Sequence, residues 1–319
     1  ETRFAGKNLT SVGGIKLFHK FARKLGVEEA LEQSINLPRR ESKYKMGRVV
    51  ISLLYALVLD LNRLSDTALL HIDGVFQKLV GFDGYPHQST FSRFLRLFTV
   101  PLAQKIGETG VSLLGKVRDD FKDYTRLTLD MDSHVETVYG NQQRAKAGYN
   151  PKKPGRKSFH PLLCFIGETR DFLWGKFRPG NRYTGQGAVG FLKECLKRLS
   201  CGIKEIFLRA DSGFFDDKFL SEVEKRRIKY AIAAKLYGTI QMMLGGVSYR
   251  DIGNGVEVGE FYYQGHKWKR ARRMVVIREE IKEGAAKKKQ PKLFELKGYS
   301  YQVIVTNIEE WSPEEVWRF

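Results

Sequence analysis

The spacing of apolar residues changes near residue 120, and this change limits what the chain can fold into. Between Ile15 and Leu25, apolar residues recur at intervals of three and four, which is the spacing of one buried helix face. Between Leu127 and Met131, apolar and polar residues alternate instead, as they do along a half-buried strand. The sequence therefore predicts a helical domain over residues 1–120 and a sheet-containing domain over residues 121–319.

The helical domain contains one segment, Val49–Leu61, that is apolar on nearly every side, and we expect it to form the central helix. After a break at Pro86, Ser89 is placed to cap a further helix. This helix, with one apolar and one basic side, would be either the recognition helix of a helix-turn-helix or a member of a plain helical bundle, and both interpretations stay open. The expected apolar side contains Phe91, Phe94, Leu95 and Phe98, and another side carries Arg93 and Arg96.

The second domain shows the order strand, strand, strand, helix, strand, helix, strand, which is typical of a mixed α/β sheet. One apolar strand is expected over Phe159–Ile166, and Phe172–Phe177 is expected to pair with it. Strand-like segments separated by glycine-rich turns then follow, so we expect a β-rich insertion over about residues 238–300. This insertion includes an expected strand at Leu293–Leu296 and the basic run Lys287–Lys289.

The chain is strongly basic, with 55 Lys and Arg against 36 Asp and Glu and a net charge of +19. Such a surplus repels itself unless a polyanion neutralises it, and this favours nucleic acid as the partner. One loop concentrates the charge without any acid, and its breakers Gly148 and Pro154 predict an exposed segment. It suits contact with phosphates, although a merely solvated loop is the alternative. Its basic residues are Arg144, Lys146, Lys152, Lys153, Arg156 and Lys157.

Two other features of the sequence concern the cellular compartment and the membrane. The three cysteines form no CxxC pair and no disulfide framework, which indicates a reducing compartment. No apolar stretch is long enough to span a bilayer, so we expect no membrane partner.

Trp268 lies in a segment where basic residues alternate with other residues. Its ring is expected either to stack on an unpaired base or to pack inside a hairpin.

Two aspartates, Asp132 and Asp211, each stand at the end of an expected strand. Phosphodiester cleavage commonly uses two divalent metal ions about 3.5–4 Å apart, held by hard oxygen ligands. Carboxylates suit Mg²⁺ or Mn²⁺, so these two residues are the candidate metal ligands and catalytic acids. Asp130 competes with Asp132, because it shares the same strand face two residues away.

Several blocks in a fixed order resemble the DDE transposases of bacterial insertion sequences. The resemblance implies a ribonuclease-H-like core, an amino-terminal helical DNA-binding domain, and a β-rich insertion before the last catalytic helix. It also implies that Asp132 and Asp211 are the first two catalytic acids, and the hydroxyl residue Ser133 favours Asp132 over Asp130. The blocks are Leu129–Ser133, Tyr139–Gln142, Gly148–Lys153, His160–Leu162, Phe177–Asn181, Arg209–Phe214, Tyr301–Asn307 and the amino-terminal Leu9–Gly14.

The third acid of that family is a glutamate on a helix that follows the strand matching Tyr301–Thr306. In this sequence the helix begins near Ser312, and Phe319 comes before the family's pattern of Tyr, Arg and Glu. Glu315 already has a structural role in a capping box with Ser312, and Pro313 occupies the first helical position. We therefore expect that these 319 residues lack the third acid and do not catalyse alone.

The resulting expectation is a transposase that cuts and joins the DNA of an insertion element with Mg²⁺ or Mn²⁺. Its partners would be double-stranded DNA at the element ends and the target, and a second copy of the chain in a dimer on DNA. The resemblance places it in the bacterial cytoplasm, at the nucleoid. Two alternatives remain, namely a catalytically incomplete DNA-binding remnant and a ribonuclease-H-like nuclease.

Overall fold

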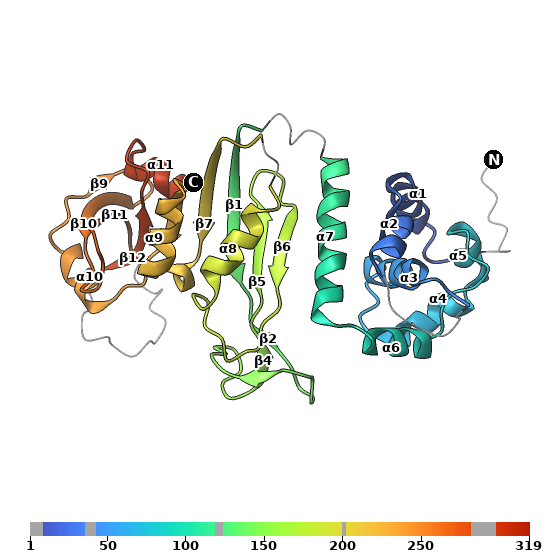
Figure 1. The fold of residues 1–319 in the computed structure, drawn as a ribbon. Helices are drawn as coiled ribbons and strands as arrows, with labels where there is room; N and C mark the ends of the chain where they lie inside the picture. Colours follow the sequence, from blue (N-terminus) through green and yellow to red (C-terminus); the bar gives the residue numbers. More distant parts are fainter. Residues whose placement is uncertain (1–8, 36–42, 119–123, 200–201, 282–297) are drawn as a thin grey trace. The chain divides into compact units, whose positions relative to one another are not determined.

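The computed structural model describes residues 9–35, 43–118, 124–199, 202–281 and 298–319. The chain divides into two units, Glu1–Phe121 and Lys122–Phe319, which are described separately below (Figure 1). Within the described ranges, no helix is long and apolar enough to cross a membrane. The basic run Lys287–Lys289 and the expected strand at residues 293–296 lie outside the described residues.

The first unit is helical, and α3 lies at its centre as the sequence predicts. Six of its residues from Val49 to Ala56 are buried, and Tyr85 donates a hydrogen bond from its hydroxyl to the carbonyl of Ser52. Helix α2 approaches α3 so closely that a side chain at Gly47 would collide with the backbone of α2. The helices are α1 Ile15–Leu25, α2 Val27–Ser34, α3 Met46–Val58, η1 Leu64–Thr67, α4 Ala68–Ile72, α5 Gly74–Leu79, α6 Gln88–Arg96 and α7 Val100–Val117.

Two details expected for helix α6 are wrong. The N-cap is His87 rather than Ser89, because the imidazole accepts a hydrogen bond from the Ser89 amide, and the helix starts two residues earlier than expected. Leu95 is 41% exposed, since the core of the unit meets this helix along the side of Phe91 and Phe94 only. Those two rings are buried as expected.

The second unit contains a large mixed sheet with the strand order β6-β5-β1-β7-β8-β12-β11-β10-β9. Strands β1, β7 and β8 are parallel, and β5 and β6 continue antiparallel beyond β1. This central arrangement confirms the expected mixed α/β, ribonuclease-H-like core. The strands are β1 Arg126–Ser133, β2 Glu136–Thr137, β3 Lys146–Ala147, β4 Lys157–Phe159, β5 Leu162–Ile166, β6 Phe172–Lys176, β7 Glu205–Ala210, β8 Lys229–Ala233, β9 Arg250–Asp251, β10 Val256–Tyr263, β11 Arg272–Glu280 and β12 Tyr299–Thr306.

Strands β9 to β12 extend the sheet beyond β8 in an antiparallel series, and β12 pairs directly with β8. Helix α8 packs on β5 and β6, α9 packs on β8, and α11 packs against β10, β11 and β12. An apolar cluster that includes Ile277, Ile304 and Val316 joins α11 to this part of the sheet. The helices are α8 Ala188–Leu196, η3 Ser212–Phe214, α9 Asp217–Lys225, α10 Gly238–Leu244 and α11 Pro313–Arg318.

A small second sheet, β2-β4-β3, follows directly after β1 and lies at one end of the large sheet (Figure 1). The single strand expected over Phe159–Ile166 is wrong in this respect, because it is divided into β4 and β5 at His160 and Pro161. Proline has no amide hydrogen to donate to a ladder, so the chain leaves one sheet and enters the other there.

Candidate active site

Asp132 and Asp211 lie side by side at the ends of parallel neighbouring strands. The register of β1 and β7 pairs Met131 with Ala210, so the next position along both strands pairs the two aspartates. The backbone of Asp211 remains extended, with φ −75° and ψ 174°. Neighbouring strands lie about 4.8 Å apart. The two carboxylates therefore project from the same edge of the sheet, close enough to share hydrated cations.

The electrostatics of Asp211 reflect this proximity. Its pKa is raised, first by desolvation and then by the negative charge of Asp132, against an opposing hydrogen bond from the Gly213 amide. The side chain is open to solvent on one side while protein surrounds its other sides. Lys235, which follows the parallel strand β8, and His160 both lower this pKa. A cation placed between the two aspartates would relieve their mutual repulsion.

Asp130 is already occupied by a different partner. Arg209 stands opposite it on β7 and donates two hydrogen bonds, from Nε to Oδ1 at 2.6 Å and from Nη2 to Oδ2 at 2.7 Å. Arg209 also donates from Nη1 to the carbonyl of Phe319 at 2.6 Å. Asp132, by contrast, accepts a short bond from its neighbour's amide, that of Ser133, at 2.7 Å. Asp132 is therefore better placed than Asp130 to bind a metal ion.

A buried histidine that no sequence pattern indicated lies beside these acids. His160 is 4% exposed, and burial lowers its pKa, so the imidazole is neutral and carries one N–H. Nδ1 lies 2.6 Å from the carbonyl of Arg182, and therefore the proton is on Nδ1. Nε2, 3.1 Å from Ser133 Oγ, then accepts the hydroxyl proton of the residue after Asp132. No local pattern marked His160 as part of the site; it appeared only within a family block.

A pocket of about 320 Å³ borders Asp132 and Asp211, and part of its wall is helix α11, through Val316, Trp317 and Phe319. The expected capping box of this helix is confirmed, because Ser312 and Glu315 exchange side-chain and backbone hydrogen bonds.

The glutamates of α11 have structural partners. Glu315 completes the cap, and Glu314 pairs with Arg318 at 2.9 Å and with Arg250 at 3.6 Å. Among the described residues, no group of three or more His, Cys, Asp and Glu side chains is arranged to hold a metal ion. Mg²⁺ usually binds through one or two carboxylates and retains several waters, so Asp132 and Asp211 fit this ion as a pair.

The basic loop lies on the small sheet that follows Asp132. Lys146 is on β3 and Lys157 is on β4, and the other four residues lie in the connections. All six side chains are exposed. In the part of the chain that the structure describes, none of them is paired with a carboxylate. Their charge is consequently available to an external anion. The six residues are Arg144, Lys146, Lys152, Lys153, Arg156 and Lys157.

Trp268 lies in the hairpin between β10 and β11, and its ring is packed there. Its ring centroid is 5.3 Å from that of Phe215 and 5.5 Å from that of Tyr263, and both contacts are edge-on. The guanidinium of Arg272 lies over the same ring at 4.6 Å. Of the two expected roles, these contacts favour packing within the hairpin.

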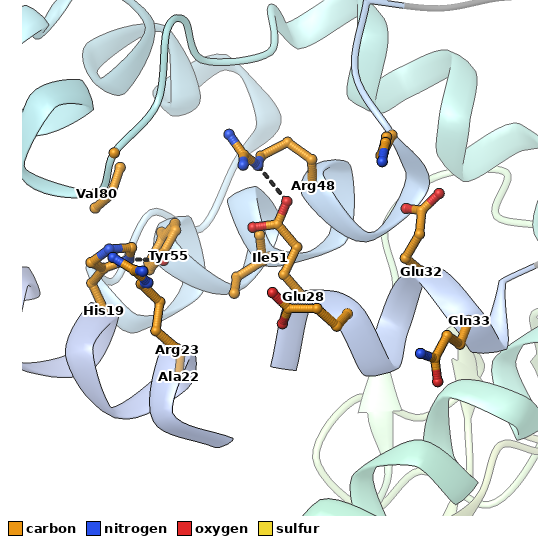
Figure 2. A pocket seen from close by; sticks show the side chains of 13 residues that line it. His19, Ala22, Arg23, Glu28, Glu32, Gln33, Arg48, Ile51, Tyr55 and Val80 are labelled. Atoms are coloured by element: carbon orange, nitrogen blue, oxygen red, sulfur yellow. Dashed lines mark hydrogen bonds and ion pairs between the residues drawn. The ribbon is translucent and has the colours of Figure 1, made fainter. Parts of the chain in front are cut away.

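The helical unit contains a separate pocket of about 560 Å³, lined by acidic, basic and apolar side chains (Figure 2). Several of its polar groups are already satisfied: Arg48 pairs with Glu28 at 2.6 Å, and Tyr55 lies 2.7 Å from Nδ1 of His19. Burial raises the pKa of Tyr55 to about 12, so its hydroxyl keeps the proton. These two contacts join α1 and α2 to α3.

Comparisons with known proteins identify one matching family model and two solved structures with weak similarity. The family model described as transposase DDE domain group 1 matches residues 1–319. A piggyBac transposase, solved in a synaptic complex with hairpin DNA, is 15% identical with a TM-score of 0.43; the match covers 92% of this chain and 61% of the other. An Argonaute from Marinitoga piezophila with a guide RNA is 12% identical with a TM-score of 0.27, covering 62% and 25%. Among curated proteins, no sequence matches.

Proposed function

The chain belongs to the transposase DDE domain group 1 family, and on this premise we propose that it is a DNA transposase. It would cut the ends of an insertion element and join them to a target. The observation that supports this most directly is the position of Asp132 and Asp211 at adjacent ends of two parallel strands. The chain spans 61% of the length of the piggyBac transposase to which it is similar, so the activity of the whole protein is part of this proposal.

The family depends on divalent metal ions, and we propose Mg²⁺, with Mn²⁺ as a substitute. When bound, such ions would polarise the phosphodiester and make the attacking oxygen a better nucleophile. Asp132 and Asp211 would hold them, and Arg209 keeps Asp130 engaged outside that role. His160 fixes Ser133 and so orients the end of β1. Lys235 supplies positive charge at the same edge for a phosphate.

The proposed partner is double-stranded DNA, at the element ends and at the target, bound by a dimer of the protein. In the helical unit, Arg93 and Arg96 of α6 are exposed while Phe91 and Phe94 fix the opposite side in the core. This helix is therefore the proposed DNA-contacting element of that unit. Arginine side chains on an exposed helix face suit contact with phosphates or base edges.

We also propose that the third catalytic acid is not among the described residues. The described glutamates of α11 are engaged in the helix cap and in ion pairs, which supports this view. A DNA-binding remnant without catalysis is the second candidate function, and the same observation favours it. The joining of cut ends to a target separates a transposase from both this remnant and a simple ribonuclease-H-like nuclease.

DNA binding is expected to depend steeply on salt. Each phosphate contact that a Lys or Arg neutralises contributes about −0.9 to the slope of log affinity against log salt. Replacing Lys152, Lys153 and Arg156 together with Ala should therefore flatten the slope by about two to three units. Fluorescence anisotropy of a labelled duplex at several salt concentrations measures it.

The matched control replaces Lys218, Lys225 and Arg227 with Ala. These residues are also exposed, carry the same total charge, and lie on or just after α9. The control should leave the slope as it is in the unmodified protein. Equal slopes for the two triple variants would show that the loop on the small sheet does not contact DNA.

A further inference from the structure

The four most exposed aromatic side chains among the described residues all come from one part of the chain. Tyr139 is 71% exposed, Tyr149 73%, Phe177 70% and Tyr183 66%. Large apolar rings at this exposure lose the stabilisation that burial would give them. Their gathering in residues 139–183, next to the strand that carries Asp132, indicates a surface with an external partner.

The segments that carry these rings are packed into one body. Phe159 forms a bridge with Pro179, and the His160 amide donates to the carbonyl of Arg178 at 2.9 Å. Gly148 lies so close to the backbone of Gly180 that no side chain would fit there. The connections of the small sheet and the loop after β6 are therefore packed together, and both carry exposed rings.

Contacts beneath the rings hold them in place. The ring of Phe177 rests against Phe159, with 4.4 Å between centroids. The guanidinium of Arg156 lies 5.7 Å from the ring centre of Tyr139. The buried Arg178 donates to the carbonyl of Tyr183 at 3.3 Å and to that of Gln186 at 2.7 Å, which fixes the loop. The ring of Phe177 and the backbone that carries Tyr183 are consequently held in place before a partner arrives.

The charge around the rings identifies the kind of partner. The same surface carries the six exposed basic residues of the loop, which have no carboxylate partner among the described residues. Exposed aromatic rings interleaved with basic side chains are the combination that binds unpaired nucleic acid, since bases stack on the rings and phosphates meet the charges. A paired duplex needs the charges but leaves its bases unavailable for stacking.

We propose that this aromatic surface, formed by Tyr139, Tyr149, Phe177 and Tyr183, binds unpaired DNA bases next to the cutting site. The inference rests on the proposed function, because it specifies the form of the DNA that a transposase of this chain engages. Strand β2 begins at Glu136, four residues after Asp132, so the surface adjoins the catalytic edge. Bases that become unpaired near the cut are held on the rings while Asp132 and Asp211 serve cleavage of the DNA backbone.

The test compares two labelled DNA probes, a blunt duplex and the same duplex with an unpaired single-stranded tail. The unmodified chain should bind the tailed probe more tightly. Tyr149→Ala and Phe177→Ala should each weaken binding of the tailed probe by about five- to 150-fold and change binding of the blunt probe little. Tyr149→Phe should restore tail binding, because it keeps the ring.

The matched control is Phe172→Ala. Phe172 is 50% exposed on the edge strand β6, which is separated from β1 by β5, and should affect neither probe. Equal losses on both probes, or no loss on the tailed probe, would overturn the aromatic surface while leaving DNA binding intact. Absence of binding to either probe by the unmodified chain would instead count against the proposed function itself.

Discussion

Excision of a marked element in cells should stop when Asp211 is replaced with Asn in the full-length protein. Asn keeps the size of the side chain but removes the negative charge that we propose holds a divalent cation beside Asp132. Metal-ion catalysis is worth several kcal/mol, which at about 1.36 kcal/mol per factor of ten corresponds to a loss of about a thousandfold or more. DNA binding should persist, because the basic loop is unchanged. A gel of labelled element-end DNA measures cleavage, and anisotropy measures binding.

Asp216→Asn is the matched control for that variant. Asp216 lies five positions further along the chain and caps α9 by accepting the amide of Phe219 at 3.2 Å. Asn caps helices about as well as Asp, so this variant should retain excision. Excision that survives Asp211→Asn would remove the catalytic assignment of the whole edge. A loss of excision in both variants would indicate that this segment tolerates no Asp→Asn substitution, whatever the role of the residue.

Replacing Arg272 with Met is expected to destabilise the second unit strongly. Arg272 is almost fully buried and donates to Glu224 at 2.8 Å and to Asp217 at 2.7 Å, which ties β11 to α9. Breaking a buried pair from one side costs about 3–5 kcal/mol. Glu224 keeps Arg270 at 2.5 Å, so the lower end of that range, about 3 kcal/mol, is expected here. For a unit of this size, that cost lowers the urea midpoint by about 1–2 M. Tryptophan fluorescence reports this unit alone, since all four tryptophans belong to it.

The surface pair of the same helix provides the comparison. Arg226 pairs with Glu222 at 2.9 Å on the surface of α9, where solvent screens the charges and such pairs contribute little to stability. Arg226→Met should therefore shift the midpoint only slightly. Similar shifts for the two variants would contradict the view that the buried cluster holds the extended strands to the core.

The cost of Arg272→Met should depend on pH through Glu224. Burial raises the pKa of Glu224, but hydrogen bonds from Arg272, Arg270 and Tyr230 outweigh this and lower it overall. A group with a lowered folded pKa stabilises the fold above its unfolded pKa, about 4.3 for Glu, and this is lost as the pH falls through the folded value. The difference in unfolding free energy between the unmodified protein and Arg272→Met should thus be largest near neutral pH and should shrink in acid.

The two acids of the candidate site were proposed from the sequence, but the choice between the neighbours Asp130 and Asp132 rested on the resemblance alone, through Ser133. The alternation of apolar and polar residues does not separate them, because both lie on one strand face. Their difference comes from Arg209, which is 79 residues from Asp130 and stands opposite it only when β1 and β7 pair in one register. The same holds for His160, whose partners Ser133 and Arg182 come from distant segments.

The fold was predictable where local rules act alone. The change in periodicity and the capping box at Ser312 depend on a few adjacent residues, and the structure has them as expected. The predicted strand over Phe159–Ile166 was divided, because the chain changes sheets there. Leu95 was expected to be buried, but the core contacts α6 only along the side of Phe91 and Phe94, so Leu95 stays exposed. The exposure of Tyr149 or Phe177 likewise depends on tertiary packing that no spacing reveals.

The central claim is that Asp132 and Asp211 bind divalent metal, and iron-directed cleavage of the chain itself tests it most directly. Fe²⁺ occupies sites built for Mg²⁺ or Mn²⁺, and with peroxide and ascorbate it cuts the backbone nearest to it. We expect cuts close to residues 130–133 and 209–213, lost in Asp132→Asn and kept in Asp130→Asn. Cuts elsewhere in the chain, or cuts that depend on Asp130 and not on Asp132, would contradict the account.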